Sequence, residues 1–172
     1  EKSNDFRVEA VNVIYDEVER LGNLINSLLS ISKIEMGSLA LNRQRVKLRE
    51  LLKDTFEAVS RSARGQGLEF NLELPGEMSH VQMDKDLLRV AINNLLTNAI
   101  KYNREGGSVS LVAEETEEDI FIRVRDTGIV IDPVDLDRVF EKFYRAENDE
   151  VRDKPGHGLG LPLATSIIEL HH

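Results

Sequence analysis

Four polar side chains recur at a spacing that places them on one side of a helix. Asn94, Asn98 and Tyr102 follow one another at intervals of four residues, and Lys101 stands three residues after Asn98. Residues three and four apart are neighbours on a helix, so these groups share a face. An amide oxygen suits Mg²⁺ beside phosphate oxygens, a lysine can meet a phosphate, and a tyrosine can lie against a base. Two asparagines on a solvated face would explain the pattern equally well.

A second candidate is the aspartate that follows a predicted strand at residues 119–125. Asp126 is followed by Thr127 and Gly128, so its carboxylate can reach a place where the backbone comes close to a ligand. A carboxylate accepts a hydrogen bond from an exocyclic amine, which suits adenine. Taken alone, this segment is explained more simply as an ordinary turn.

A third candidate is the glycine-rich segment at residues 156–161, which opens a predicted helix. Backbone N–H groups and the field of a helix N-terminus favour a polyphosphate there. The segment is neither a Walker loop nor a dinucleotide fingerprint, because no Gly-Lys-Ser/Thr follows it and no strand precedes it. The charged residues 148–155 are typical of a mobile lid. Before this lid, Phe140, Phe143 and Tyr144 are expected to form a small hydrophobic plug.

The elements that must position these residues are a mixture of helices and strands. Hydrophobic periodicity predicts helices at residues 48–64, at 85–102 and from about 158 to the end. Alternation and turn residues predict strands at residues 45–48, 68–74, 80–83, 108–114 and 119–125. Because the last two strands form a predicted hairpin, we expect an α+β sandwich and not a doubly wound parallel sheet.

A long helix is predicted before this domain. Its apolar residues step by three and four, which is a heptad-like seam; they are Val11, Ile14, Val18, Leu21, Ile25 and Leu28. Gly37 is a suitable end for the helix. A lone helix cannot bury such a seam, so it packs either on its own domain or, as we favour, in a bundle between subunits. We expect two regions, at residues 1–37 and 38–172.

Composition limits the classes of function. The formal net charge of −9 disfavours general nucleic-acid binding. The chain has no cysteine, which excludes disulfides, thiol catalysis and zinc-thiolate sites. No apolar run approaches the roughly 18 residues that span a bilayer, so any membrane anchor would lie outside this sequence.

In their order along the chain, these segments resemble the catalytic domain of sensor histidine kinases, within the wider Bergerat-fold ATP-binding superfamily. Residues 94–102 resemble the N box of the family, 126–128 the first glycine box, 140–144 the F box and 156–161 the second glycine box. Residues 20–37 resemble the second dimerisation helix. The resemblance implies a two-layer α/β sandwich preceded by one long coiled-coil-like helix, without the first dimerisation helix and without the closing C-terminal strands.

The resemblance also implies roles for single residues. Asn98 would bind Mg²⁺ with Asn94 beside it, Lys101 would touch phosphate, Tyr102 would line the nucleotide site, and Asp126 would bind the adenine amine. The other nucleotide-binding residues that it implies are Gly128, Lys142, Arg145, Gly156, Gly158, Leu159 and Gly160. It implies ATP and Mg²⁺ as ligands, phosphoryl transfer to a histidine, a homodimer through the helix bundle, a response regulator as partner, and a cytoplasmic location.

Departures from the family pattern leave other hypotheses open. The sequence lacks a phosphoacceptor motif of the type Ser-His-Glu-Leu-Arg, so we expect no autophosphorylation by this chain alone. Val130 stands where the first glycine box usually has glycine, and it would be strained if that position needed a positive φ. A degenerate regulatory module, impaired by Val130, is therefore the alternative. Hydrolytic relatives carry a glutamate at the place of Asn94, which cannot act as a general base, so we expect the site to position ATP for transfer and not for rapid hydrolysis. An ATPase of the superfamily is the third hypothesis, which steady hydrolysis by this chain would support.

Overall fold

The computed structural model describes residues 2–63 and 65–171, without the side chains of residues 2–9 and 16. The chain divides into two compact units, Glu1–Leu39 and Ala40–His172. Among the described residues, no helix is both long enough and apolar enough to cross a membrane.

The first unit is a single helix, α1 (Lys2–Glu35), and the chain leaves it through Gly37 at a φ of 62°. A positive φ is inexpensive for glycine, which explains the end of the helix. The side chains of the predicted seam are 41% to 63% exposed; they are Val11, Ile14, Val18, Leu21, Ile25 and Leu28.

The second unit is an α+β domain, which confirms the predicted fold class. Its elements are β1 (Gln44–Lys47), α2 (Leu48–Ser62), β2 (Glu69–Glu73), β3 (His80–Met83), α3 (Lys85–Lys101), β4 (Ser108–Glu115), β5 (Ile120–Asp126), the 3-10 helix η1 (Arg138–Phe140), α4 (Asp149–Arg152) and α5 (Gly160–His171). The predicted strand at residues 80–83 has the bounds of β3. Helix α2 was predicted to reach Arg64, which lies outside the described residues.

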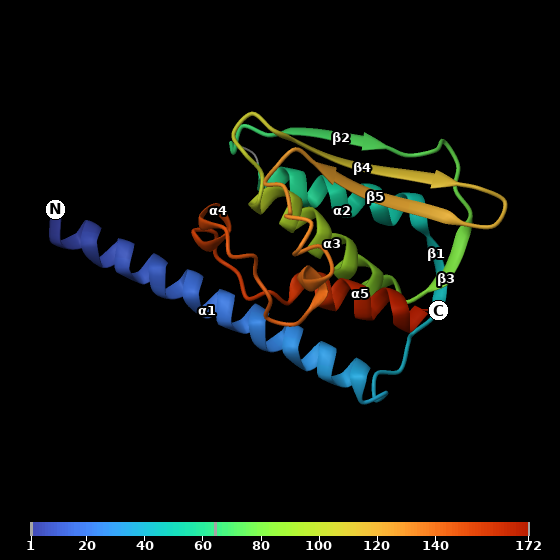
Figure 1. Cartoon of the computed structure of the whole chain (residues 1–172), viewed down its shortest axis with the longest axis horizontal. Helices are drawn as coiled ribbons and strands as arrows, with labels where there is room; N and C mark the ends of the chain where they lie inside the picture. The colour runs from blue at the N-terminus through green and yellow to red at the C-terminus, as the bar shows by residue number, and fades with distance from the viewer. Residues whose placement is uncertain (1, 64, 172) are drawn as a thin grey trace. The chain divides into compact units, whose positions relative to one another are not determined.

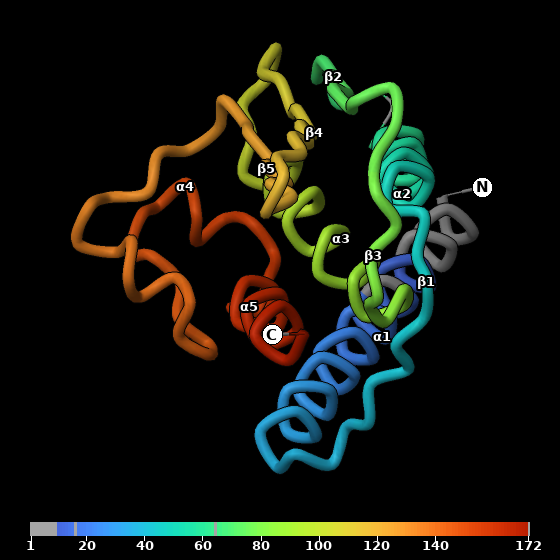
Figure 2. Tube along the Cα trace, turned by 90° about the vertical axis from the view of Figure 1, so that its right-hand side faces the viewer, coloured from blue at the N-terminus to red at the C-terminus, as the bar shows by residue number. Residues whose placement is uncertain are grey.

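The main sheet has three strands in the order β2-β4-β5. Strands β2 and β4 run parallel, with Glu69 opposite Ser108, and β4 and β5 form the predicted antiparallel hairpin, with Val109 opposite Asp126. Strands β1 and β3 form a separate antiparallel pair. Helices α2 and α3 pack against one face of the main sheet, and α5 packs against α3 (Figures 1 and 2).

The core between this sheet and the helices fixes how α3 is turned. Leu88, Ile92 and Leu96 of α3 are buried with Leu52 of α2 and Leu111 of β4. Burying each such side chain contributes about 1.5–3 kcal/mol, so rotating α3 about its axis would be costly. The apolar face of α3 therefore points to the sheet, and its polar face is held on another side.

The start of α3 is fixed by a capping residue. Asp84 is buried, and its Oδ1 atom accepts hydrogen bonds from the backbone N–H groups of Asp86 and Leu87, both at 3.1 Å. Its Oδ2 atom accepts from the N–H of Asn42 at 3.0 Å. Capping of this kind contributes about 1 kcal/mol and confirms the helix start predicted at residue 85.

Candidate functional site

The polar face of α3 lies against the beginning of α5. The side-chain amides of Asn94 and Asn98 are half-buried, and Asn94 donates from Nδ2 to the carbonyl of Val90 at 2.9 Å. A Cβ atom added to Gly160 would lie 3.1 Å from Asn94 Oδ1 and 3.5 Å from Asn98 Nδ2. The glycine thus allows the α5 backbone to approach both amides closely.

The next turn of α3 carries an amine and a phenol in contact. Lys101 Nζ donates to the Tyr102 hydroxyl at 2.8 Å and lies 4.4 Å from the centre of the Tyr102 ring. Gly156 packs on this pair, since an added Cβ would stand 2.2 Å from Lys101 Nζ and 3.5 Å from the Tyr102 hydroxyl. The glycine-rich segment therefore passes over the two residues that were predicted to meet phosphate and base.

The turn after β5 docks on the C-terminal end of the same helix. Asp126 Oδ1 accepts the N–H of Gly128 at 2.9 Å, and the N–H of Ile129 donates to the Tyr102 carbonyl at 2.9 Å. A Cβ at Gly128 would stand 2.3 Å from the Tyr102 carbonyl oxygen. The Asp126 carboxylate is exposed at this place. Asp126 thus lies at the end of α3 that carries Lys101 and Tyr102.

The glycine-rich segment at residues 156–161, the turn at residues 126–128 and the polar face of α3 meet at one place in the second unit. Three groups of predicted residues are brought together there: Asn94, Asn98, Lys101 and Tyr102 from α3 and its C-terminal cap; Asp126 at the end of β5 with Gly128 in the turn after it; and Gly156 and Gly160 before and at the start of α5. Leu159 belongs to the buried core.

The amide oxygens on α3 suit an Mg²⁺ ion that is also bound by the phosphate oxygens of a ligand. Among the described residues, no group of three or more His, Cys, Asp or Glu side chains could hold a metal ion. The α3 face instead offers the amides of Asn94 and Asn98. Mg²⁺ commonly keeps waters and takes phosphate oxygens alongside few protein ligands, so amide oxygens beside a polyphosphate fit its chemistry.

The segment between β5 and α5 is built on two backbone positions with left-handed geometry. Phe143 has a φ of 66° and Gly158 a φ of 67°, and the N–H of Phe143 donates to the Gly158 carbonyl at 2.9 Å. The prediction that Phe140 and Phe143 belong to a hydrophobic plug is wrong, because their side chains are 53% and 58% exposed. The left-handed turn at Phe143, fixed by a partner 15 residues away, could not be seen in the local sequence.

Tyr144 anchors this segment through a carboxylate. Its hydroxyl donates to Asp135 Oδ1 at 2.5 Å, and the Arg138 guanidinium lies 4.1 Å from its ring centre. The hydrogen bond with Asp135, with burial as the second cause, raises the pKa of the Tyr144 phenol. Asp135 stood in no sequence motif, so sequence reasoning missed it.

The side chain of Arg145 binds the backbone of the predicted lid. Its guanidinium donates to the carbonyls of Val151, Lys154 and Gly156, the last two at 2.6 and 3.1 Å. Lys142, the other predicted cation, is exposed. The lid contains the single-turn helix α4, capped by Asn148, whose Oδ1 accepts the N–H of Glu150 at 2.8 Å.

Val130 is not strained. Among the described residues, Phe143 is the one non-glycine residue with a positive φ, so the strain considered for Val130 is not present. Its side chain is 85% exposed. Any impairment by Val130 would have to come from its contact with a ligand and not from its backbone.

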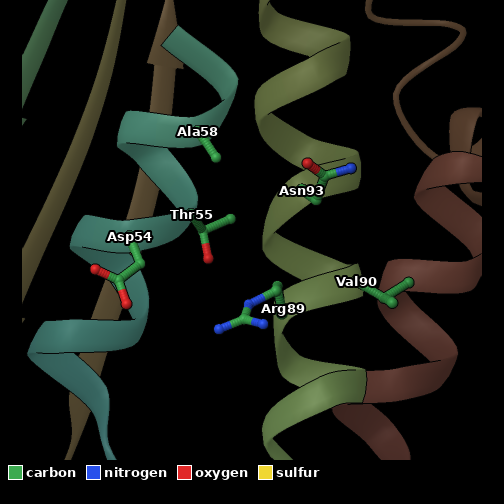
Figure 3. A pocket seen from close by; sticks show the side chains of 6 residues that line it. All are labelled: Asp54, Thr55, Ala58, Arg89, Val90 and Asn93. Atoms are coloured by element: carbon green, nitrogen blue, oxygen red, sulfur yellow. The ribbon is translucent and has the colours of Figure 1, made fainter. Parts of the chain in front are cut away.

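A cavity of about 390 Å³ lies elsewhere, between α2 and α3 (Figure 3). Its lining residues are Asp54, Thr55, Ala58, Arg89, Val90 and Asn93. None of them belongs to the predicted site, and none is a glycine that would let a backbone approach a phosphate. We therefore place the candidate site between α3, the turn at residues 126–128 and the glycine-rich segment at residues 156–161, and not at this cavity.

Comparisons with known proteins identify the family. Residues 83–172 match the family model described as histidine kinase-, DNA gyrase B- and HSP90-like ATPase. The chain is 34% identical over 175 residues to the sensor histidine kinase WalK of Bacillus subtilis (strain 168), covering 99% of this chain and 28% of WalK. It is 31% identical over 165 residues to the sensor protein SrrB of Staphylococcus aureus (strain N315), covering 95% of this chain and 28% of SrrB. The chain thus spans a little over a quarter of the length of these relatives.

Solved structures share the fold. The histidine kinase AdeS of Acinetobacter baumannii superposes with a TM-score of 0.75 at 22% identity, over 92% of this chain and 72% of that one. At this identity the likeness concerns the fold alone.

Proposed function

Since the chain belongs to the sensor histidine kinases of the histidine kinase-, DNA gyrase B- and HSP90-like ATPase family, we propose that its second unit binds ATP with Mg²⁺ for phosphoryl transfer. The acceptor would be a histidine on a dimerisation helix that this sequence does not contain. The observation that carries the proposal is the packing of Gly156 on Lys101 and of Gly160 on Asn94 and Asn98. A glycine-lined backbone over an amine and two amides is suited to a metal-bound polyphosphate.

Each residue has a distinct task in this proposal. Asn98 offers its amide oxygen to the metal with Asn94 beside it, and Lys101 holds phosphate as a point charge. Tyr102 lines the base, and Asp126 accepts a hydrogen bond from the adenine amine. The remaining contacts come from backbone at Gly128, Gly156, Gly158, Leu159 and Gly160, with Lys142 and Arg145 at the edge.

The site is suited to transfer and not to rapid hydrolysis. Asn94 occupies the position where a hydrolytic site would need a carboxylate, and a neutral amide cannot take a proton from water. The bound Mg²⁺ would supply charge neutralisation on the phosphates. Lys101 and the glycine-segment N–H groups would stabilise the charge on the transferred group and orient it toward an incoming nucleophile.

The first unit fits a role in dimerisation. Its apolar seam, Val11 to Leu28, is exposed on α1, and two such helices gain stability by burying their seams in one bundle. We propose that residues 1–37 are the second helix of a dimerisation domain and that residues 38–172 are the catalytic domain. We also propose that the protein forms a homodimer and that its protein partner is a response regulator. Its proposed location is cytoplasmic, with any membrane anchor outside this sequence.

Calorimetry with a non-hydrolysable ATP analogue, with and without Mg²⁺, tests the binding step. We expect binding that requires Mg²⁺ and that falls by about tenfold to a hundredfold in Asp126→Asn, since a hydrogen bond to a charged group is worth about 1.5–3 kcal/mol. Asn98→Ala should weaken binding as well, because it removes the amide oxygen offered to the metal. Asn93→Ala is the matched control, because it removes a neighbouring exposed amide. Undiminished binding in both site variants would contradict the proposed roles.

The transfer step is tested by adding a dimerisation domain that carries the phosphoacceptor histidine. We expect label from ATP to appear on that domain and none on this chain. Val130→Gly distinguishes a working nucleotide site from the alternative hypothesis. A degenerate module would bind no nucleotide until the valine is replaced. Because Val130 is exposed and unstrained, we expect similar affinities for the two chains.

A further inference from the structure

Asn103 is a buried polar residue outside all the motifs that led to the site. It lies two residues after the end of α3 and is only 8% exposed. A buried amide is unfavourable unless its donors and acceptors are satisfied, so its partners show what it holds together.

The Asn103 side chain connects the end of α3 to the start of β4. Its Nδ2 group donates to the carbonyl of Ala99 at 3.0 Å and to the carbonyl of Ser108 at 2.9 Å. Its Oδ1 atom accepts the N–H of Arg104 at 3.0 Å. Two carbonyl partners on one side and an N–H on the other require this orientation of the amide.

Thr127 extends these contacts to the turn that carries Asp126. The Thr127 hydroxyl lies 3.5 Å from Asn103 Oδ1, within reach to donate, and accepts the N–H of Ser108 at 2.8 Å. The backbone N–H of Thr127 also donates to the Ser108 carbonyl at 3.2 Å. Asn103, Ser108 and Thr127 therefore form one hydrogen-bonded cluster.

The glycines on either side of Asn103 are closely packed against the cluster. A Cβ on Gly107 would stand 2.2 Å from Asn103 Oδ1 and 2.8 Å from Thr127 Oγ1, and a Cβ on Gly128 would stand 2.9 Å from Asn103 Cα. A displaced Asn103 would therefore shift the turn at Asp126–Gly128 relative to α3.

We propose that Asn103 is a positioning residue that sets the Asp126 carboxylate at the correct distance from Lys101 and Tyr102, and thereby sets selectivity for the base. The proposal rests on the proposed nucleotide site. Asn103 touches no nucleotide in this scheme; it acts through Thr127 and the turn.

The test compares the affinities of ADP and inosine diphosphate, both with Mg²⁺, measured by calorimetry. The two ligands differ at the purine edge, where inosine has a carbonyl in place of the amine that Asp126 would bind. We expect the wild-type chain to prefer ADP by about tenfold or more, and this ratio to fall at least about threefold in Asn103→Ala and Asn103→Asp. The aspartate has the shape of asparagine but sets a carboxylate against two carbonyls.

Thr55→Ala is the matched control, because Thr55 is also buried and hydrogen-bonded, to the Leu51 carbonyl at 2.7 Å, but lies in α2. Thr55→Ala should lower the free energy of unfolding without changing the ratio of ADP to inosine diphosphate affinity. If the Asn103 variants also leave this ratio unchanged, the role of Asn103 is purely structural and the proposal is wrong. Should the Asn103 variants fail to fold, Thr127→Val decides in the same assay, and a retained ratio overturns the proposal. Absence of any nucleotide binding by the wild-type chain would instead refute the proposed function.

Discussion

Gly156 lies so close to Lys101 that a methyl group added at position 156 would stand 2.2 Å from the Lys101 Nζ atom. The atom in the way is the end of a flexible side chain, so Gly156→Ala should displace the amine without unfolding the domain. We expect a free energy of unfolding within about 0.5 kcal/mol of the wild type, as for most surface substitutions. Affinity for an ATP analogue should fall by about tenfold, because the displaced amine loses its place beside the phosphates.

Gly76→Ala is the control for Gly156→Ala, since a Cβ at Gly76 meets nothing within 4 Å. Calorimetry and urea denaturation on both variants separate affinity from stability. Equal affinities of the two variants would mean that Lys101 does not contact the nucleotide.

Gly158 and Gly106 offer a matched pair for measuring backbone contact in the loop before α5. Both have a positive φ, 67° and 69°, but a Cβ at Gly158 would stand 2.5 Å from the Tyr144 carbonyl oxygen, whereas a Cβ at Gly106 meets nothing within 4 Å. Gly106→Ala should lower the free energy of unfolding by about 1–2 kcal/mol through the strain of the left-handed conformation alone. Gly158→Ala should lower it by roughly a further 1–3 kcal/mol, because the backbone of Phe143 and Tyr144 must move. Urea denaturation measures both, and equal losses would contradict the close packing.

The sequence predicted the regular elements where local signals were strong. Hydrophobic periodicity predicted a helix at residues 85–102, and the structure confirms it as α3, Lys85–Lys101. Alternation predicted β2 and β5 to within two residues at each end. These signals are local because capping and periodicity depend on neighbours three or four residues away.

The remaining features depend on contacts between distant segments. The left-handed turn at Phe143 is paired with Gly158, and the burial of Asn103 is created by Gly107 and Thr127. No local pattern encodes these pairings, so the sequence predicted a plug at Phe140 and Phe143 and gave Asn103 no role. The proximity of Lys101 and Gly156 likewise follows from the packing of α5 on α3.

The bond between Tyr144 and Asp135 predicts a pH effect on the loop before α5. The pKa of the Tyr144 phenol is raised above its usual value of about 10. The stability that this bond contributes is therefore complete below about pH 10 and is lost as the pH rises through the raised pKa. An ultraviolet titration of tyrosinate, with Tyr144→Phe to assign the signal, should give a lower midpoint in Asp135→Asn. An unchanged midpoint would show that Asp135 does not hold the phenol.

The contacts of Arg145 predict how often the lid opens in the absence of nucleotide. Its guanidinium bonds to the carbonyls of Val151, Lys154 and Gly156, and within the described part of the chain its buried Nε atom has no hydrogen-bond partner. Removing a charged donor typically costs about 1.5–3 kcal/mol, so Arg145→Met should make lid opening about tenfold or more frequent. Hydrogen exchange of the amides at residues 151–154 measures this opening.

Two further variants make the lid experiment specific to the guanidinium fork. Arg145→Lys keeps the charge but has all its donors on one nitrogen, whereas the guanidinium reaches the three carbonyls from two nitrogens held in a planar fork. Its exchange should therefore resemble that of Arg145→Met. Arg152→Met removes an exposed guanidinium that lies 3.8 Å from Asp149, an ion pair expected to contribute little. If Arg152→Met accelerates exchange as much as Arg145→Met does, the lid responds to any loss of charge and the three carbonyl bonds do not hold it. If only the Arg145 variants accelerate it, the bonds from the guanidinium to the three carbonyls hold the lid closed.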